Sequence, residues 1–365
     1  MSFEKVGFIG LGLIGGSIAK TIKKKYPDTT LIATARHADT IQEAHDFGTI
    51  ENDTLLPLSD FADCDYIFLC TPVQQNLIYL KELKSVIKPS CIITDVGSVK
   101  SDIHKAVTAL DIEANFIGGH PMCGSEKTGF FNATEYLLEN AYYIITPTAK
   151  TAPAQLEDFH ALVKSLGSVP MILDYEKHDF ATAAISHLPH IIASSLVNLV
   201  SDLDDEQETM RTIAAGGFKD ITRIASSSPV MWHNICLSNQ EQILKLTDCY
   251  IHALQNIRSS VADAKSDDII SFFRNAKDYR DSITTPVRGS LQKNYSVYCD
   301  LVDEAGAIAT LATIMASHNI SIKNIGILHN REYEDGVLQI EFYEEDALEK
   351  AVKLMEDNHY VVHRR

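Results

Sequence analysis

The sequence predicts an α/β protein of three domains: a dinucleotide-binding domain over residues 1–174, an all-helical domain over residues 175–290 and a small βαββαβ domain over residues 295–365. Three observations support this prediction. A glycine-rich motif stands between a short apolar strand pattern and a helix pattern near the N-terminus. After Tyr175 the apolar residues recur at helical spacing, and after Tyr295 the pattern reads strand, helix, strand, strand, helix, strand. The 365 residues are enough for each domain to bury its own core.

The composition is typical of an ordered globular protein, with 45% hydrophobic and 22% charged residues. The formal net charge of -17 argues against nucleic acid and anionic membrane surfaces as partners, and an anionic substrate would need cationic groups in its pocket. The seven cysteines are odd in number and form no CxxC pair, so neither a disulfide framework nor a zinc site is indicated. Reduced thiols favour the cytoplasm, and we expect no segment long enough to span a bilayer.

A strand pattern at residues 6–9 leads directly into a GxGxxG motif that opens a helix pattern. In this setting the first glycine permits a tight turn, the second lets the backbone approach a pyrophosphate, and the third lets the helix pack closely on the strand. The helix N-terminus favours the negative charge of the phosphates. The motif therefore predicts a Rossmann domain whose cofactor contacts include Gly10, Gly12, Leu13, Ile14 and Gly15.

Further strand patterns place more candidate contacts at the carboxyl edge of the predicted sheet. Residues 30–35 end at Arg36, where an NAD-selective site commonly carries an acidic residue. Arg36 could stack on adenine or pair with a 2′-phosphate, so we expect NAD without excluding NADP. Continuous apolar runs at residues 66–73 and 91–98 are typical of buried parallel strands. Their ends add four expected cofactor contacts: Thr71, Pro72, Asp95 and Ser98.

The stretch IGGHPMCGSEKTG, residues 117–129, is the candidate catalytic segment. Gly118 and Gly119 permit either a close approach of the backbone to a neighbour or a positive φ, and Pro121 fixes a turn after His120. This pattern predicts a sharp backbone turn after a short strand and excludes an ordinary helix or strand interior. A strand over residues 116–119 would deliver the imidazole to the same sheet edge as the cofactor. A loop histidine without a task is the simpler interpretation, but the neighbouring motifs favour a functional one.

The helical domain contains a second group of candidates. Apolar residues at three- and four-residue steps predict a helix with one buried face: Ile185, Leu188, Ile192, Leu196 and Leu199. His187 and His190 share a different side, and Pro189 between them must start or kink a helix. Arg223 stands among apolar residues, where a guanidinium needs an anionic partner; a helix with solvated charges is the equally weighted alternative.

Several motifs occur together in one order along the chain: GLGLIGGS, TDVGSVK, GGHPMCGSEKTG, ISHLPH, GGFKDITRIA and the terminal βαββαβ pattern. Together they resemble prephenate dehydrogenases of the monofunctional bacterial type that carry a C-terminal ACT domain, and the resemblance covers essentially the full chain. It implies a Rossmann domain, an all-α domain that forms a homodimer and a ferredoxin-like ACT domain. It also implies a cytoplasmic enzyme that oxidises prephenate to 4-hydroxyphenylpyruvate and carbon dioxide in tyrosine biosynthesis.

The resemblance also implies roles for individual residues. His120 would be the catalytic base, and Ser98 would orient it near the nicotinamide. Four residues would bind the substrate: His187, His190, Arg223 and Glu126. The chemistry suits these residue types, because a neutral imidazole accepts a hydroxyl proton and an arginine holds a carboxylate; no metal is needed. Trp232 corresponds to an aromatic residue near the site of the family.

For the last domain the resemblance implies an amino-acid site, and tyrosine, the end product of the pathway, is the expected effector. The expected effector contacts are Asp303, Gly306, Ala307 and Asn324. Gly306 would let a helix N-terminus approach the carboxylate of the ligand. The alternative is a stabilising appendage. Residues 277–294, with Pro286 and Gly289, are the expected linker into this domain.

Two other functions are compatible with parts of the sequence. Arogenate dehydrogenase performs the same reaction on the amino form of the side chain, and the sequence does not distinguish the two substrates. A catalytically silent sensor of dinucleotides and amino acids would have no use for a base beside the nicotinamide, so His120, Ser98 and Arg223 argue against it.

Overall fold

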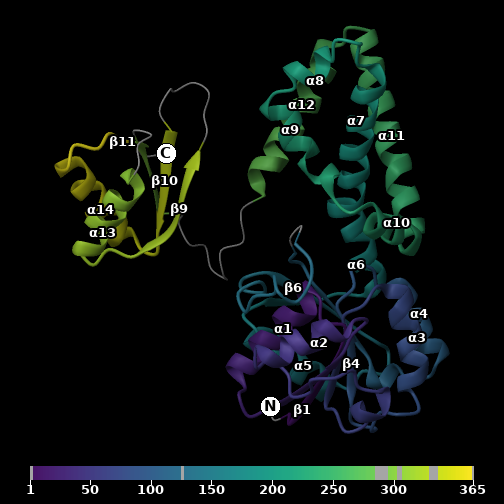
Figure 1. Cartoon of the computed structure of the whole chain (residues 1–365). Helices are drawn as coiled ribbons and strands as arrows, with labels where there is room; N and C mark the ends of the chain where they lie inside the picture. The colour runs from purple at the N-terminus through teal and green to yellow at the C-terminus, as the bar shows by residue number, and fades with distance from the viewer. Residues whose placement is uncertain (1–2, 125–126, 284–294, 302–305, 329–335, 364–365) are drawn as a thin grey trace. The chain divides into compact units, whose positions relative to one another are not determined.

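The computed structural model describes residues 3–124, 127–283, 295–301, 306–328 and 336–363. The chain divides into two compact units, Met1–Ala264 and Lys265–Arg365 (Figure 1). The first unit contains the predicted dinucleotide-binding sheet and the helices that follow it. The second contains one helix and the small sheet domain.

The sheet of the first unit has the predicted parallel strands. Strands β1 (Lys5–Ile9), β2 (Thr30–Thr34), β3 (Tyr66–Leu69) and β4 (Ile92–Asp95) are parallel in the order β2-β1-β3-β4. A bridge between Ile93 and Phe116 continues from β4 into a second sheet of order β5-β6-β7. Its strands are β5 (Ile117–Pro121), β6 (Tyr142–Pro147) and β7 (Val169–Ile172). The strand order reverses between β1 and β3, which is where ligands bind in doubly wound folds.

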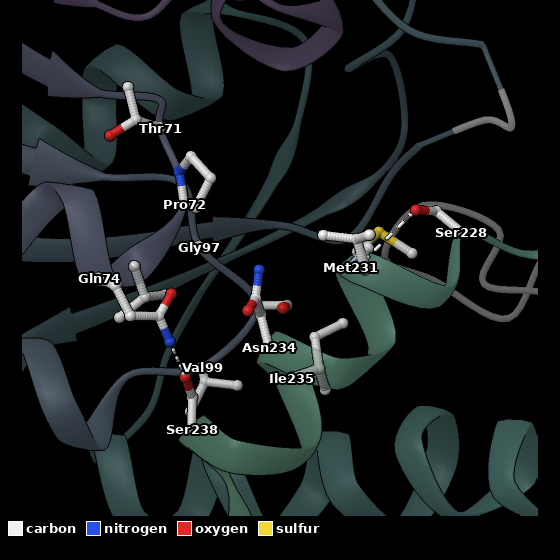
Figure 2. A pocket seen from close by; sticks show the side chains of 13 residues that line it. Thr71, Pro72, Gln74, Gly97, Val99, Ser228, Met231, Asn234, Ile235 and Ser238 are labelled. Carbon is white, nitrogen blue, oxygen red and sulfur yellow. Dashed lines mark hydrogen bonds between the residues drawn. The ribbon is translucent and has the colours of Figure 1, made fainter.

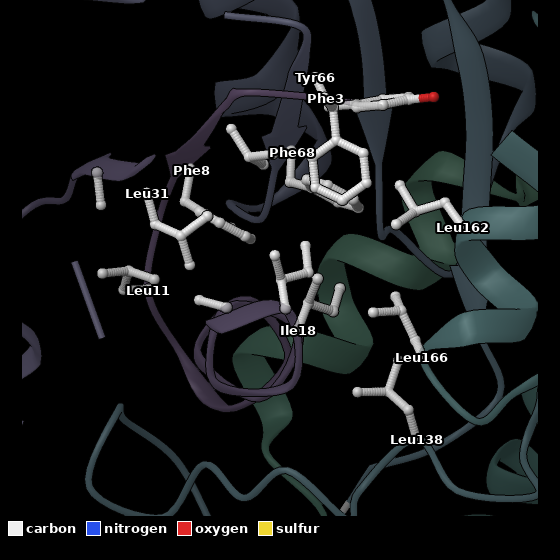
Figure 3. Packing of buried hydrophobic residues seen from close by; sticks show 14 of the residues in the cluster. Phe3, Phe8, Leu11, Ile18, Leu31, Tyr66, Phe68, Leu138, Leu162 and Leu166 are labelled. Atoms are coloured by element: carbon white, nitrogen blue, oxygen red, sulfur yellow. The ribbon is translucent and has the colours of Figure 1, made fainter. Parts of the chain in front are cut away.

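Helices cover both faces of this sheet. On one face lie α1 (Leu13–Lys25), α2 (Ala38–Asp46) and α5 (Pro153–Ser165); on the other lie α3 (Val73–Leu83) and α4 (Ser101–Ala109) (Figure 1). Figure 3 shows Phe8, Leu31 and Phe68 of the strands pointing toward Ile18 of α1. Burying each such side chain stabilises the fold by about 1.5–3 kcal/mol. Because both faces are covered, the strands are apolar throughout, and this explains the continuous apolar runs.

The helical part of the first unit begins with one long helix. Helix α6 (Tyr175–Thr182) continues through a π-helical turn, η3 (Ala183–His187), into α7 (Leu188–Leu203). By length and composition alone this helix could cross a membrane. The prediction that no segment is long enough is therefore wrong, because the helix passes through Pro189 instead of ending there. The predicted buried face is also wrong within this unit, since Ile185 is 69% and Leu199 is 53% exposed.

Shorter helices complete the first unit. They are α8 (Thr209–Ile213), α9 (Gly216–Thr222), the 3-10 turn η4 (Arg223–Ser226), α10 (Pro229–Ser238) and the long α11 (Gln240–Ala262). Two further 3-10 turns, η1 (Leu58–Phe61) and η2 (Glu113–Asn115), lie in the sheet region.

The second unit contains the predicted βαββαβ fold. Its elements are β8 (Tyr295–Leu301), α13 (Ala307–Ser317), β9 (Ile322–Leu328), β10 (Gly336–Phe342), α14 (Glu345–Asp357) and β11 (Val362–His363). The sheet is antiparallel in the order β11-β8-β10-β9, which is the ferredoxin-like arrangement and confirms the prediction. The predicted linker is wrong at its start, because α12 (Ser266–Ser282) continues through residue 277, and a Lys277–Asp281 ion pair one turn apart supports that helix. Residues 284–294 lie outside the described residues.

Candidate active site

The GxGxxG motif forms a turn that fits a pyrophosphate. Gly10 has a φ of +96°, and a Cβ added to Gly15 would lie 2.6 Å from the Gly10 carbonyl oxygen. A Cβ on Gly12 would meet open space, so the backbone is accessible at this point. Helix α1 begins at the next residue without a side-chain cap from Gly12, which leaves the N–H groups of Leu13 and Ile14 available to a ligand. These residues fit the phosphates of a dinucleotide.

A cavity of about 360 Å³ lies beside the carboxyl ends of β3 and β4 (Figure 2). Its sheet side includes Thr71, Pro72 and Ser98, three of the predicted cofactor contacts, and its other side is formed by α10. The amide of Gln74 donates to Ser238 Oγ at 3.1 Å and so joins α3 to α10 at the edge of the cavity (Figure 2). The cavity therefore lies between the sheet and the helical part, at the strand ends where a nicotinamide ring is expected.

Asp95 ends β4 as predicted, and its side chain is bonded inside the protein. Its carboxylate is fully buried, forms an ion pair with the equally buried Lys100, and accepts the N–H of Gly97 at 2.9 Å and of Gly119 at 3.3 Å. Burial lowers the pKa of Lys100, and the attraction of Asp95 opposes this shift. The carboxylate of Asp95 therefore fixes the loop that leads to Ser98 against β5, and the contact of Asp95 with the cofactor stays a prediction.

His120 lies within strand β5, so the predicted sharp turn is wrong. The residue pairs with Ile144 in an antiparallel ladder. The two glycines before it serve close packing: a Cβ on Gly118 would lie 2.2 Å from Thr146 Oγ1, and a Cβ on Gly119 would lie 2.7 Å from the Asp95 carbonyl oxygen. Glycine is thus required by neighbouring strands and not by backbone direction.

The half-buried imidazole of His120 continues into a chain of buried polar groups. His120 Nδ1 lies 2.8 Å from His178 Nε2, and His178 Nδ1 lies 2.8 Å from Asp179 Oδ1. Burial holds the pKa of His120 well below its usual value, and the nearby charge of Lys100 acts in the same direction. The ring is therefore neutral at pH 7, as a general base must be. Ser98 lines the cavity, and the Nδ1 atom of His120 is bonded to His178. The orientation of His120 by Ser98 therefore stays a prediction.

Sequence reasoning missed His178 and Asp179. They are adjacent residues in α6, a helix whose N-cap is Asp174, and they are 1% and 0% exposed. Two neighbours on a helix carry no spacing pattern that distinguishes a site from a solvated pair. Only the packing of α6 against β5 and the start of α4 brings them to His120.

The structure brings His187, His190 and Trp232 together. The rings of His190 and Trp232 are stacked, with centroids 3.8 Å apart and planes at 28°, and His187 approaches Trp232 edge-on at 6.0 Å. His190 Nδ1 donates to the Ser186 carbonyl oxygen at 2.9 Å, so its Nε2 atom is the one left for a ligand. Among the described residues the buried indole N–H of Trp232 has no hydrogen-bond partner.

Asn239, which the sequence analysis did not single out, connects the two groups of histidines. Its side-chain amide donates to the Asp179 carbonyl oxygen at 2.8 Å and lies 3.2 Å from His187 Nδ1. Burial lowers the pKa of His187 to about 4, so this ring is also neutral at pH 7. Because His187 Nδ1 accepts from the amide, its proton is on Nε2.

Two other predicted positions are at the surface of the unit. Arg223 begins η4 and is exposed, so within one chain it is not the buried cation that an anionic substrate would need. Among the described residues, Lys100 is a buried cation near the site, but it is paired with Asp95. Arg36 is exposed beyond the end of β2. Glu126 lies outside the described residues.

The predicted effector residues belong to the second unit. Gly306 has a φ of +95° and caps α13, which begins at Ala307, as the expected approach of a carboxylate requires. Asn324 is exposed on β9, and its side-chain oxygen accepts the N–H of Ile325 at 2.9 Å. Asp303 lies outside the described residues.

Comparison with known protein families gives two matches that together cover most of the chain. The profile described as "Prephenate dehydrogenase, nucleotide-binding domain" matches residues 18–172, and the profile "Prephenate dehydrogenase, dimerization domain" matches residues 174–275. The chain belongs to the prephenate dehydrogenase family. The first match contains Ser98 and His120, and the second contains His178, His190 and Arg223. The glycine motif precedes the first match, so its assignment depends on the geometry described above.

Individual members of the prephenate dehydrogenase family agree with this result. A prephenate dehydrogenase of Bacillus subtilis is 39% identical over 349 residues, which are 95% of this chain and 94% of the relative. The structure of the A. aeolicus prephenate dehydrogenase in complex with hydroxyphenyl propionate and NAD+ has a TM-score of 0.73 at 28% identity and covers 78% of this chain and 99% of that chain. The Synechocystis arogenate dehydrogenase has a TM-score of 0.70 at 30% identity, covering 77% and 100%.

Proposed function

We propose that this chain is an NAD-dependent prephenate dehydrogenase that converts prephenate to 4-hydroxyphenylpyruvate and carbon dioxide. The observation that carries the proposal is the position of His120, a half-buried neutral base on the strand that Asp95 fixes beside the cavity loop. The relatives named prephenate dehydrogenase and the NAD+ complex of the A. aeolicus protein support the substrate and the cofactor.

The reaction needs a base, a hydride acceptor and groups that hold two carboxylates. When bound, NAD supplies the acceptor for the hydride that leaves C4 of prephenate. His120 takes the proton of the 4-hydroxyl through Nε2 while the ring carboxylate departs as carbon dioxide and the ring becomes aromatic; the proton then returns to the phenolic oxygen of the product. Such a proton transfer contributes about two to four orders of magnitude in rate. Ser98, on the cavity wall, helps to orient the imidazole.

The substrate carboxylates are assigned to Arg223 and His190, with His187 and Glu126 as further pocket residues. Arg223 is exposed in one chain, so its binding role requires a second chain to enclose it. We propose that the helical domain forms this homodimer. The support is its exposed apolar surface, which includes Ile185, Leu199, Leu203, Ile213, Leu237 and Val261.

The remaining assignments complete the proposal. The domains are residues 1–174, 175–290 and 295–365, and the last is an ACT domain that binds tyrosine near Gly306 and lowers activity. Tyrosine would act by binding a less active arrangement more tightly. All seven cysteines are free thiols, which supports a cytoplasmic location.

The test is an assay of the purified protein with prephenate or arogenate, each with NAD or NADP, followed by the absorbance of the reduced nicotinamide. We expect the highest kcat/KM with prephenate and NAD. Preference for arogenate would favour the second candidate, which the similarity to the Synechocystis arogenate dehydrogenase supports. No reaction with either substrate would contradict both. Calorimetry with tyrosine, and loss of inhibition on removal of residues 295–365, test the regulatory part.

His120→Asn should lower kcat at least about a hundredfold, because it removes the base, while the affinity for NAD changes little. Steady-state kinetics and a NAD titration measure the two effects. A variant with near-normal kcat would remove His120 from the mechanism.

Arg223→Ala should raise KM for prephenate at least about tenfold, since a hydrogen bond between charged groups contributes about 1.5–3 kcal/mol. Lys219→Ala, a cation lost from the same region, is the matched control and should leave KM within about twofold. Equal KM values in the parent and the Arg223 variant would assign Arg223 a structural role.

A further inference from the structure

The hydrogen-bond chain that ends at His120 has a definite direction. An ionised carboxylate only accepts hydrogen bonds, so Asp179 Oδ1, at 2.8 Å, places the proton of His178 on Nδ1. His178 Nε2 then carries a lone pair and accepts from His120 Nδ1, also at 2.8 Å. His120 therefore has its proton on Nδ1 and its lone pair on Nε2.

Asp179 is ionised and rigidly held. Its two oxygens also accept the N–H of Lys100 at 2.8 Å and of Ser101 at 2.7 Å, where α4 begins. Burial raises the pKa of this carboxyl group, but the hydrogen bonds from His178, Ser101 and Lys100 outweigh burial and hold the pKa below its usual value. The helix N-terminus adds to this stabilisation of the negative charge. Asp179 thus remains an acceptor at pH 7.

We propose that His178, held by Asp179, is a positioning residue that sets the tautomer and the orientation of His120 so that Nε2 is the proton acceptor. The inference rests on the proposed role of His120 as the base. With the opposite tautomer, His120 would present an N–H to the substrate hydroxyl and could not take its proton. The same contact stabilises the imidazolium that forms during the reaction, because a hydrogen bond accepted from the charged ring favours that form.

Two substitutions of His178 separate the hydrogen bond from the space that the ring fills. His178→Leu removes the acceptor and should lower kcat about ten- to a hundredfold, with KM for prephenate and the dissociation constant for NAD changed by less than about threefold. His178→Gln supplies a side-chain oxygen that can accept from His120 Nδ1 and should recover a large part of the lost kcat. If the ring of His178 only filled space, the Gln variant would not recover kcat relative to the Leu variant.

Asp179→Asn is the third variant. An amide can donate to His178 Nδ1 and so reverse both tautomers; the corresponding change in a serine protease lowers kcat about 10⁴-fold. We expect a loss of at least about tenfold here, again in kcat. His104→Leu is the matched control, because His104 is also buried, on α4, and its ring nitrogen bonds Thr146 instead of a member of this chain of groups.

The outcomes distinguish this inference from the proposed function. The expected result is reduced kcat in His178→Leu and Asp179→Asn, recovery in His178→Gln and parental kcat in His104→Leu, each measured per mole of folded enzyme. A His178→Leu variant with kcat within about twofold of the parent, or equal losses in Leu and Gln, would overturn the positioning role while leaving His120 as the base. If the parent enzyme does not oxidise prephenate, or His120→Asn retains full activity, the proposed function itself fails.

Discussion

The sheet region, up to β7, and the helical region, from α6 to α11, place their apolar side chains in opposite ways. In the sheet region Phe8, Ile18 and Phe68 are at most 1% exposed, and they pack between the strands and α1 (Figure 3). In the helical region Ile185 is 69% and Ile213 is 71% exposed. The core of the sheet region is therefore closed within one chain, whereas the helical region exposes apolar side chains that the proposed dimer would cover.

This difference separates two kinds of functional residue. His120 lies in the sheet region and is half-buried, and His178 and Asp179, at the start of the helical region, are buried beside it within one chain. Arg223 lies in the helical region and is exposed in one chain. Groups that require fixed geometry are thus positioned by a core that is already closed, and the proposed anion-binding group depends on assembly.

The largest expected effect tests whether the sheet region is held by its buried charges. Lys100→Met leaves Asp95 buried without its ion-pair partner and should lower the free energy of unfolding by about 3–5 kcal/mol. Lys150→Met is the control, because Lys150 pairs with Asp111 at the surface, and it should change that energy by less than about 1 kcal/mol. Urea unfolding measures both. Equal changes in the free energy of unfolding would show that burial of the Lys100–Asp95 pair does not add to its effect on stability.

One buried histidine from each region should make the stability of the protein depend on pH. Burial lowers the pKa of His104 in the sheet region and of His187 in the helical region to about 4. Between about pH 6.5 and 4 the unfolded chain binds protons that the folded chain does not, so stability is lost as the pH falls through this window. By pH 4.5 each residue should have lowered the free energy of unfolding by about 2 kcal/mol. Urea unfolding at pH 7 and 4.5 should show that His104→Leu loses less stability between these pH values than the parent protein does. An equal loss of stability would contradict the lowered pKa of His104.

The smallest expected effect concerns the exposed helical surface. Leu199→Asp places a charge on the proposed dimer interface and should weaken association at least about tenfold, or about 1.4 kcal/mol. Leu55→Asp, a similarly exposed leucine of the sheet region, should leave the dimer unchanged. Sedimentation over a range of concentrations measures the association. A parent protein that is monomeric at micromolar concentration would contradict the homodimer.

Much of the fold could be predicted because its signals are local. Strand patterns, the glycine motif and the βαββαβ order depend on neighbouring residues, and the structure confirms them. His120 stands out by its unusual local sequence. The sharp turn predicted there is wrong, but the close approach predicted at its two glycines is confirmed. Gly118 and Gly119 have no room for a side chain because β6 and the end of β4 lie close to them. The sequence of the segment alone does not show which strands these neighbours are.

The unpredicted features depend on contacts between distant segments. His178 is 58 residues from His120, and Asn239 is 60 residues from Asp179. No repeat or spacing links them. The burial of Ile185 and Leu199 was also predicted from spacing alone, which identifies an apolar face but not the surface that covers it.

The π-helical turn η3 has a consequence for how this sequence can change. Such a turn contains one more residue than the α-helical path it replaces, and it lies directly before α7. Deleting one residue between Ala183 and His187 would restore the α-helical path between the same ends, so α7 would keep its orientation relative to α6 and His190 would stay beside Trp232. Deleting one residue within α7 before His190 would instead rotate the rest of the helix by about 100° and move His190 away from Trp232. A one-residue deletion should therefore be tolerated in this turn better than in the helix that follows it.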